Sequence, residues 1–192
     1  RVNQNGIFLL GPTMMESGTE EQKARFLPRM AAGDDIWAQA WSEPGAGSDL
    51  AGVRSTCTRA KNDEWGDHYV LNGQKIWSSR ATFADWAFGL FREPGSERHK
   101  GMSLVLFPLD APGVEVRPIK QMSGGANFNE VFLTDVRLPD SLRLGPVGEG
   151  WRVALTCLGF ERDHSAGSSS AHTGGGYKQA LAAAQHFGVA SD

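Results

Sequence analysis

The chain has little of several features that mark specialised proteins. Only two of its 192 residues are cysteines, Cys57 and Cys157, and they lie far apart in segments of different predicted structure. Two such cysteines indicate neither a disulfide framework nor a metal site, because both need clustered or regularly spaced residues. We therefore expect a protein of a reducing compartment that holds no metal ion.

The sequence also lacks long apolar runs and a strong excess of either charge. No stretch approaches the ~20 apolar residues of a membrane span, and the first residues contain no signal-peptide core. The formal net charge is −3, and no basic stripe offers a surface to nucleic acid. With 40% hydrophobic residues, we expect a soluble globular polypeptide with no membrane span and no nucleic-acid partner.

The first zone of the chain has the pattern of a helix. From Met14 to Ala31 apolar residues recur at helical spacing, and Thr19 stands three residues before Gln22 as in a capping box. This pattern predicts a short amphipathic helix that ends at Gly33.

The middle zone, 36–144, consists of short runs bounded by turn residues, which is typical of strands. The predicted strands are Val53 to Ala60, Asp67 to Leu71, Gln74 to Trp77, Ala84 to Phe91, Met102 to Leu109, Val114 to Ile119 and Glu130 to Val136. Asn72-Gly73 is the sharpest hairpin signal, because a type I′ turn needs φ > 0 at both central positions. We therefore expect residues 69–71 to pair with residues 75–77 within a barrel or sandwich.

The last zone returns to a helical pattern after Gly150. Its apolar face comprises Trp151, Val153, Ala154, Leu155, Leu158 and Gly159. A stretch of small residues follows at 165–184, and it indicates either a helix packed closely in a bundle or a flexible linker.

The segment from Gln39 to Asp49 changes abruptly from a strand-like run into a glycine-rich turn. Gly45 and Gly47 are expected to take φ > 0 and to let the backbone approach a ligand, while Ser42 and Ser48 offer hydroxyls. The segment predicts the edge of a nucleotide-cofactor site. The alternative is an ordinary exposed hairpin connection.

Several blocks, in this order and spacing, resemble the acyl-CoA dehydrogenase family. They are Gly18 to Lys23, Ser42 to Asp49, Asn72 to Trp77, Ala111 to Val114, Glu130 to Pro139 and Gly148 to Trp151. The resemblance covers essentially the whole chain and implies a multidomain α+β flavoenzyme, in which an antiparallel β-barrel or sandwich is flanked by helices. It implies that residues 1–34 end an N-terminal helical domain, 35–145 form the middle β domain, and 146–192 begin a C-terminal helical bundle. The chain is then a piece of a longer protein.

The resemblance further implies FAD, held against the middle domain by two segments. The implied cofactor-binding residues are Gln39, Trp41, Ser42, Gly47, Ser48, Trp77, Ser78 and Ser79. Backbone groups near Trp41 and the Ser42 hydroxyl would meet the pyrimidine edge of the flavin, and Ser48 would reach a phosphate or the CoA moiety. The Trp77 indole would pack beside the ring, and a hydroxyl or amide that follows it would approach N5. A common family variant has tyrosine where this chain has Gln39, so contacts by an aromatic ring are lost there.

Catalysis in this family needs a carboxylate that removes the α-proton of an acyl thioester, and burial can make glutamate a competent base near neutral pH. By resemblance, Glu161 stands at one of the two family positions for that base, and Arg162 at a substrate-binding arginine. The alternatives are a base beyond residue 192, or a structural ion pair or solvated face at Glu161 and Arg162. Arg98, His99 and Lys100 form either a site for CoA phosphates or a solvated turn.

The implied activity is α,β-desaturation of an acyl-CoA, with electrons passed to an electron-transfer flavoprotein by a homo- or hetero-oligomer, dimer or tetramer. The alternatives are an acyl-CoA oxidase and a non-catalytic FAD-binding subunit of a heteromeric dehydrogenase. The acyl group is left open between straight, branched and steroid-type thioesters. The expected location is the cytoplasm in a bacterium or the mitochondrial matrix in a eukaryote. This piece alone is expected to be inactive, because its sites would be incomplete.

Overall fold

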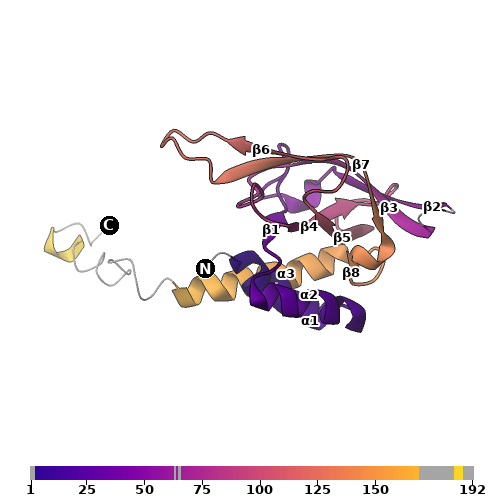
Figure 1. The fold of residues 1–192 in the computed structure, drawn as a ribbon. Helices are drawn as coiled ribbons and strands as arrows, with labels where there is room; N and C mark the ends of the chain where they lie inside the picture. The colour runs from indigo at the N-terminus through magenta and orange to yellow at the C-terminus, as the bar shows by residue number, and fades with distance from the viewer. Residues whose placement is uncertain (1–2, 63, 65, 169–183, 188–192) are drawn as a thin grey trace.

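The computed structural model describes residues 3–62, 64, 66–168 and 184–187, and it shows a β layer with the main helices on one side (Figure 1). The helices are the π-helical η1 (Asn5–Leu10), α1 (Gly11–Ser17), α2 (Glu20–Ala32) and α3 (Gly150–Ser168). The strands are β1 (Trp37–Ala40), β2 (Thr56–Asn62), β3 (Gly66–Lys75), β4 (Trp86–Arg92), β5 (Met102–Pro108), β6 (Val114–Ile119), β7 (Phe128–Pro139) and β8 (Arg143–Leu144), with 3₁₀ turns η2 (Leu50–Gly52) and η3 (Asp140–Leu142). No helix among these residues is long and apolar enough to cross a membrane.

The strands form one mixed sheet in the order β6-β7-β3-β2-β4-β5-β8, with β1 beside β4. Most neighbours are antiparallel, but β1 runs parallel to β4, and β2 meets β4 in parallel at one residue pair. Over the described strands the sheet does not close, so the predicted barrel or sandwich is confirmed in its sandwich-like form. β4 and β5 are almost entirely buried, and α3 packs against both.

The predicted capping box lies at the start of α2. The Gln22 amide donates to the Thr19 hydroxyl, and the Gln22 side chain accepts from the Thr19 amide. Gly33 ends the helix with a left-handed φ of 82°. The predicted single helix from Met14 is instead two helices, because the backbone becomes extended at Gly18. A Cβ at Gly18 would lie 2.6 Å from the Met14 carbonyl oxygen, so the position favours glycine.

The predicted hairpin at Asn72-Gly73 is wrong. Residues 66–75 form the single strand β3, which pairs with β2 on one side and β7 on the other. The register against β7 shifts between Leu71 and Gly73, where Gly73 has a φ of 143°. The Asn72 side chain and Asp135 are joined by two hydrogen bonds, of 3.0 and 2.9 Å. Between these pairs the single residue Asn72 stands opposite two residues of β7, Thr134 and Asp135, so the bulge lies on β7, where Asp135 has a φ of 49°. The dipeptide therefore faces a β-bulge instead of forming a turn.

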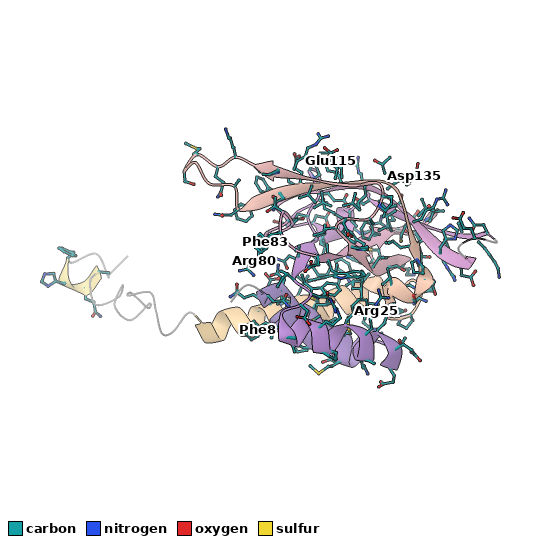
Figure 2. The ribbon with its side chains drawn as sticks, in the orientation of Figure 1. Phe8, Arg25, Arg80, Phe83, Glu115 and Asp135 are labelled. Atoms are coloured by element: carbon teal, nitrogen blue, oxygen red, sulfur yellow. The ribbon has the colours of Figure 1, made fainter. Side chains whose placement is uncertain are left out.

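An aromatic cluster joins α2 to the sheet. The ring of Phe26 packs edge-on against Trp37 and Trp86, at 5.5 and 5.2 Å between centroids, and the two indoles stack at 5.6 Å. The guanidinium of Arg25, labelled in Figure 2, lies 4.7 Å from the Phe26 ring. The helices and the sheet thus share one core.

α3 buries part of its predicted face. Val153 and Ala154 are buried together with Cys157, which the pattern did not include, while Leu155 is 44% exposed. Both cysteines are free and buried. Most of the small-residue stretch at 165–184 lies outside the described residues.

Candidate functional site

The two segments singled out in the sequence lie side by side in the fold. β1 leads into the segment that ends at Asp49, and β3 leads into Trp77-Ser78-Ser79. They meet where the Ile76 amide donates to the Ser42 carbonyl oxygen at 2.9 Å. The ends of two strands that are far apart in the sequence therefore bring these residues together.

The turn that follows Ser42 is closed by its own backbone. Glu43 and Ala46 exchange two hydrogen bonds, of 2.8 and 3.0 Å. The expectation of φ > 0 at Gly45 and Gly47 is wrong, since neither is among the glycines with positive φ. A Cβ at either glycine would meet nothing within 4 Å. These glycines, with exposed Ser48, instead leave an open surface beside the turn.

Gln39 and Trp41 support each other. The indole N–H of Trp41 donates to the Gln39 side-chain oxygen at 3.2 Å. The indole is buried and packs edge-on against Phe88. Gln39 therefore orients Trp41. The sequence did not reveal this role, because it showed only that Gln39 replaces the tyrosine of a common family variant.

Trp77 and Ser78 differ sharply in exposure. Trp77 is 55% exposed and packs edge-on against Phe128, with 6.1 Å between ring centroids. Its backbone φ of 60° lies in the left-handed region, which is uncommon for a bulky residue. Ser78 is buried. Its amide donates to the Asn129 carbonyl oxygen at 3.0 Å, and its own carbonyl oxygen accepts from the Asn129 side chain at 2.8 Å. Ser79 is half-buried.

Two buried polar atoms at this point are unsatisfied. The Ser78 hydroxyl oxygen and the Asn129 Oδ1 have no hydrogen-bond partner within the described part of the chain. Buried polar atoms without a partner cost free energy, so they commonly mark a place where a ligand or water binds.

A hollow of about 720 Å³ lies away from these residues, between α2 and η3.

A buried ion pair beneath the site was missed in the sequence. The Lys75 ammonium is fully buried and donates to Glu43 at 2.8 Å and to the Leu90 carbonyl oxygen at 2.6 Å. The same carboxylate accepts from the backbone amides of Arg54 and Ser55. The pair therefore ties the turn after Ser42 to the end of β3. In the sequence, the signal for this pair was that Glu43 lies in the block Ser42 to Asp49 and Lys75 in the block Asn72 to Trp77.

The two partners of this pair both have a lowered pKa. Burial alone raises the pKa of Glu43, but the charge of Lys75 and the hydrogen bonds to the carboxylate outweigh it, and the result is a pKa below the usual value. Burial lowers the pKa of Lys75, and the attraction of Glu43 opposes that change. The carboxylate is consequently ionised at neutral pH.

Glu161 and Arg162 lie on α3, which packs against η1, α1 and β5. Glu161 is half-buried and Arg162 is exposed. Burial raises the pKa of Cys157, one helical turn earlier, to about 12, and the nearby charge of Glu161 contributes to the rise. Glu161 therefore lies close enough to the buried part of the helix to act on it electrostatically.

The loop with Arg98, His99 and Lys100 lies against the start of α3. These three residues are exposed, and the His99 ring lies 4.5 Å from the Trp151 ring between centroids. Arg92 holds the loop, because its guanidinium donates to the carbonyl oxygens of Arg98 and Ala51. This arrangement leaves three basic groups at the surface.

A family comparison and a comparison with curated proteins both match this chain to acyl-CoA dehydrogenases. The family described as "Acyl-CoA dehydrogenase, middle domain" matches residues 38–136. The curated acyl-CoA dehydrogenase IpdE1 of Mycobacterium tuberculosis is 52% identical over 163 residues, which cover 84% of this chain and 41% of that protein.

Two solved structures have the same fold over most of the chain. The Tcur3481-Tcur3483 steroid ACAD superposes with a TM-score of 0.75 at 37% identity, covering 81% of this chain and 39% of its own. The ChsE4-ChsE5 complex of Mycobacterium tuberculosis gives 0.74 at 38% identity, covering 83% and 41%. The chain thus spans about two fifths of the length of the proteins it matches.

Proposed function

The chain belongs to the acyl-CoA dehydrogenase family, and from that premise we propose that it forms part of an FAD-dependent enzyme that desaturates an acyl-CoA thioester between its α and β carbons. The observation that carries the proposal is the contact of Ser42 with Ile76, which joins the two predicted flavin segments. The family is generally FAD-dependent, which agrees with this arrangement.

The residues present fit a flavin. An exposed indole at Trp77 offers an aromatic face, the surface at Gly45 and Gly47 is open, and the Ser78 hydroxyl lacks a partner in the described structure. Backbone groups at Ser42 and Ser79 would hold the ring by hydrogen bonds, and Trp41 would pack nearby. When bound, FAD supplies the acceptor for the hydride that leaves the β carbon of the substrate. An oriented hydrogen-bond donor in such a site lowers the activation barrier by ~3–4 kcal/mol.

Glu161 is the proposed base, and Arg162 a proposed substrate ligand. The half-buried Glu161 carboxylate would take the α-proton of the thioester, because a carboxylate positioned beside a reacting group can act as a general base. Ser48 would contact a phosphate or the CoA moiety, and the basic loop at Arg98 would approach the CoA phosphates.

The solved neighbours extend the proposal to substrate and assembly. One is titled a steroid ACAD, and both are named as pairs of different chains. We therefore propose a steroid-type CoA thioester as the substrate class and a hetero-oligomer as the assembly, with an electron-transfer flavoprotein as acceptor.

The chemistry is tested with the complete polypeptide, which is mixed anaerobically with a panel of acyl-CoA thioesters. We expect flavin bleaching with steroid-type thioesters. In Glu161→Gln, we expect exchange of the substrate α-proton with deuterated solvent and the rate of bleaching to fall by at least ~100-fold, the usual contribution of a general base. Glu149→Gln, at an exposed residue immediately before the same helix, is the matched control. Wild-type exchange rates in Glu161→Gln would assign the base to another residue.

A further inference from the structure

We infer that Asn129 is a positioning residue that aims the backbone at Trp77-Ser78-Ser79 toward the flavin. Asn129 lies on β7 and is fully buried, whereas the three residues that it serves lie outside any strand. The inference rests on the proposed function, since it gives Asn129 a part in the same site.

Asn129 binds both sides of Ser78. Its main-chain carbonyl oxygen accepts from the Ser78 amide at 3.0 Å, and its side-chain Nδ2 donates to the Ser78 carbonyl oxygen at 2.8 Å. The first bond resembles sheet pairing and is available to any residue at 129. The second needs a side-chain donor of this length, and therefore depends on asparagine.

These two bonds fix the direction of the neighbouring peptide groups. A trans peptide is planar, and its C=O and N–H point to opposite sides. Because the Ser78 carbonyl faces Asn129, the Ser79 N–H that follows must point away from Asn129. This N–H has no acceptor among the described residues. The side chain at 129 therefore leaves one backbone donor oriented and available for a ligand.

The same bonds hold an unfavourable backbone conformation. Trp77 has a φ of 60°, a conformation that a large side chain rarely adopts. The bond from Ile76 to Ser42 restrains the chain before Trp77, and Asn129 restrains it afterwards. Phe128, the neighbour of Asn129 on β7, meets the Trp77 indole edge-on. One stretch of β7 thus sets both the ring and the peptide that follows it.

The test is FAD binding to the complete polypeptide carrying Asn129→Ala or Asn129→Asp. Removing the Nδ2 donor in Asn129→Ala should raise the FAD dissociation constant about tenfold, the effect of one lost oriented bond, and shift the visible band of the bound flavin. Asn129→Asp should bind weakly at neutral pH and recover at acidic pH, because a protonated carboxyl can again donate to the Ser78 oxygen. Ser103→Ala, which removes a buried hydroxyl that donates to Glu93 on another part of the sheet, should bind FAD as the wild type does.

Each outcome decides between explanations. Wild-type affinity and flavin spectrum in Asn129→Ala would overturn the inference and leave the proposed function intact. If Asn129→Ala fails to fold by circular dichroism, the pH profile of Asn129→Asp decides, and weak binding that acid does not restore overturns it. Failure of the wild-type protein to bind FAD would instead overturn the proposed function.

Discussion

At the scale of single residues, the Glu43–Lys75 pair is the main polar link under the site. Both groups have lost nearly all contact with water, with side-chain exposures of 7% and 0%. An ion pair of this kind gains little over a well-packed apolar pair, but breaking it leaves one uncompensated charge. Its role is therefore to fix which segments meet, since the carboxylate and ammonium together bind Arg54, Ser55 and Leu90.

We expect Lys75→Met to lower the free energy of unfolding by ~3–5 kcal/mol, because it strands the Glu43 carboxylate in the interior. The double variant Glu43→Gln/Lys75→Met should recover much of that loss. Urea unfolding measures both. Lys61→Met, which removes an exposed partner 3.9 Å from Asp67, should have little effect. Equal stability of Lys75→Met and Lys61→Met would contradict the assigned role.

The lowered pKa of Glu43 predicts a pH dependence. A carboxyl whose pKa is lower in the folded than in the unfolded chain stabilises the fold above its unfolded pKa of ~4.3, and loses this contribution as the pH falls through the folded value. In Lys75→Met the charge of Lys75 is lost and burial raises the pKa of Glu43. The stability difference between wild type and Lys75→Met should therefore narrow as the pH falls from this raised pKa to the lowered pKa of the wild type. Unfolding curves at several pH values measure this difference. A constant difference down to acidic pH would show that Glu43 carries no charge in the folded protein.

At the scale of elements, the part of β3 that faces the bulge of β7 connects the sheet to the site. Gly73 lies between the strand residues that pair with β2 and the end of the strand at Lys75. A Cβ at Gly73 would come within 2.2 Å of the Ser55 hydroxyl oxygen and 2.7 Å of its Cα. Ser55 also donates its amide to Glu43, so this close approach brings Gly73 against the turn of the site.

Gly73→Ala should destabilise the protein by at least ~2 kcal/mol, because it combines a strained positive φ with overpacking. Gly45→Ala is the matched control, since its Cβ would meet nothing and its φ is not positive. Thermal unfolding compares the two variants. A smaller loss in Gly73→Ala than in Gly45→Ala would contradict this account of Gly73.

The elements also show what local sequence patterns could and could not predict. The cap at Thr19, the stop at Gly33 and most strands were predictable, because each depends on residues that are close in the chain. Asn72-Gly73 misled, since Gly73 uses its positive φ inside a strand, where the register against β7 shifts, and not in a turn. Glu43 with Lys75 and Asn129 with Ser78 are tertiary contacts, and only the strand order, which the pattern does not specify, brings them together.

At the scale of the whole molecule, the helices cover one side of the sheet (Figure 1) and share its core. The predicted flavin segments follow the ends of β1 and β3. Gly150 begins α3 in close contact with β5, where a Cβ would lie 2.5 Å from the Leu104 nitrogen. The helix with Glu161 is therefore fixed to the same sheet that presents Trp77. The division into domains at residues 34 and 145 stays a prediction.

The most direct test of the flavin site is the FAD affinity of Trp77→Ala in the complete polypeptide. Because Trp77 is 55% exposed, its removal should leave thermal stability almost unchanged. If its indole packs beside the flavin, the FAD dissociation constant should rise at least ~10-fold, the equivalent of 1.4 kcal/mol. Wild-type affinity in Trp77→Ala would contradict the assignment of the surface around Trp77 to FAD.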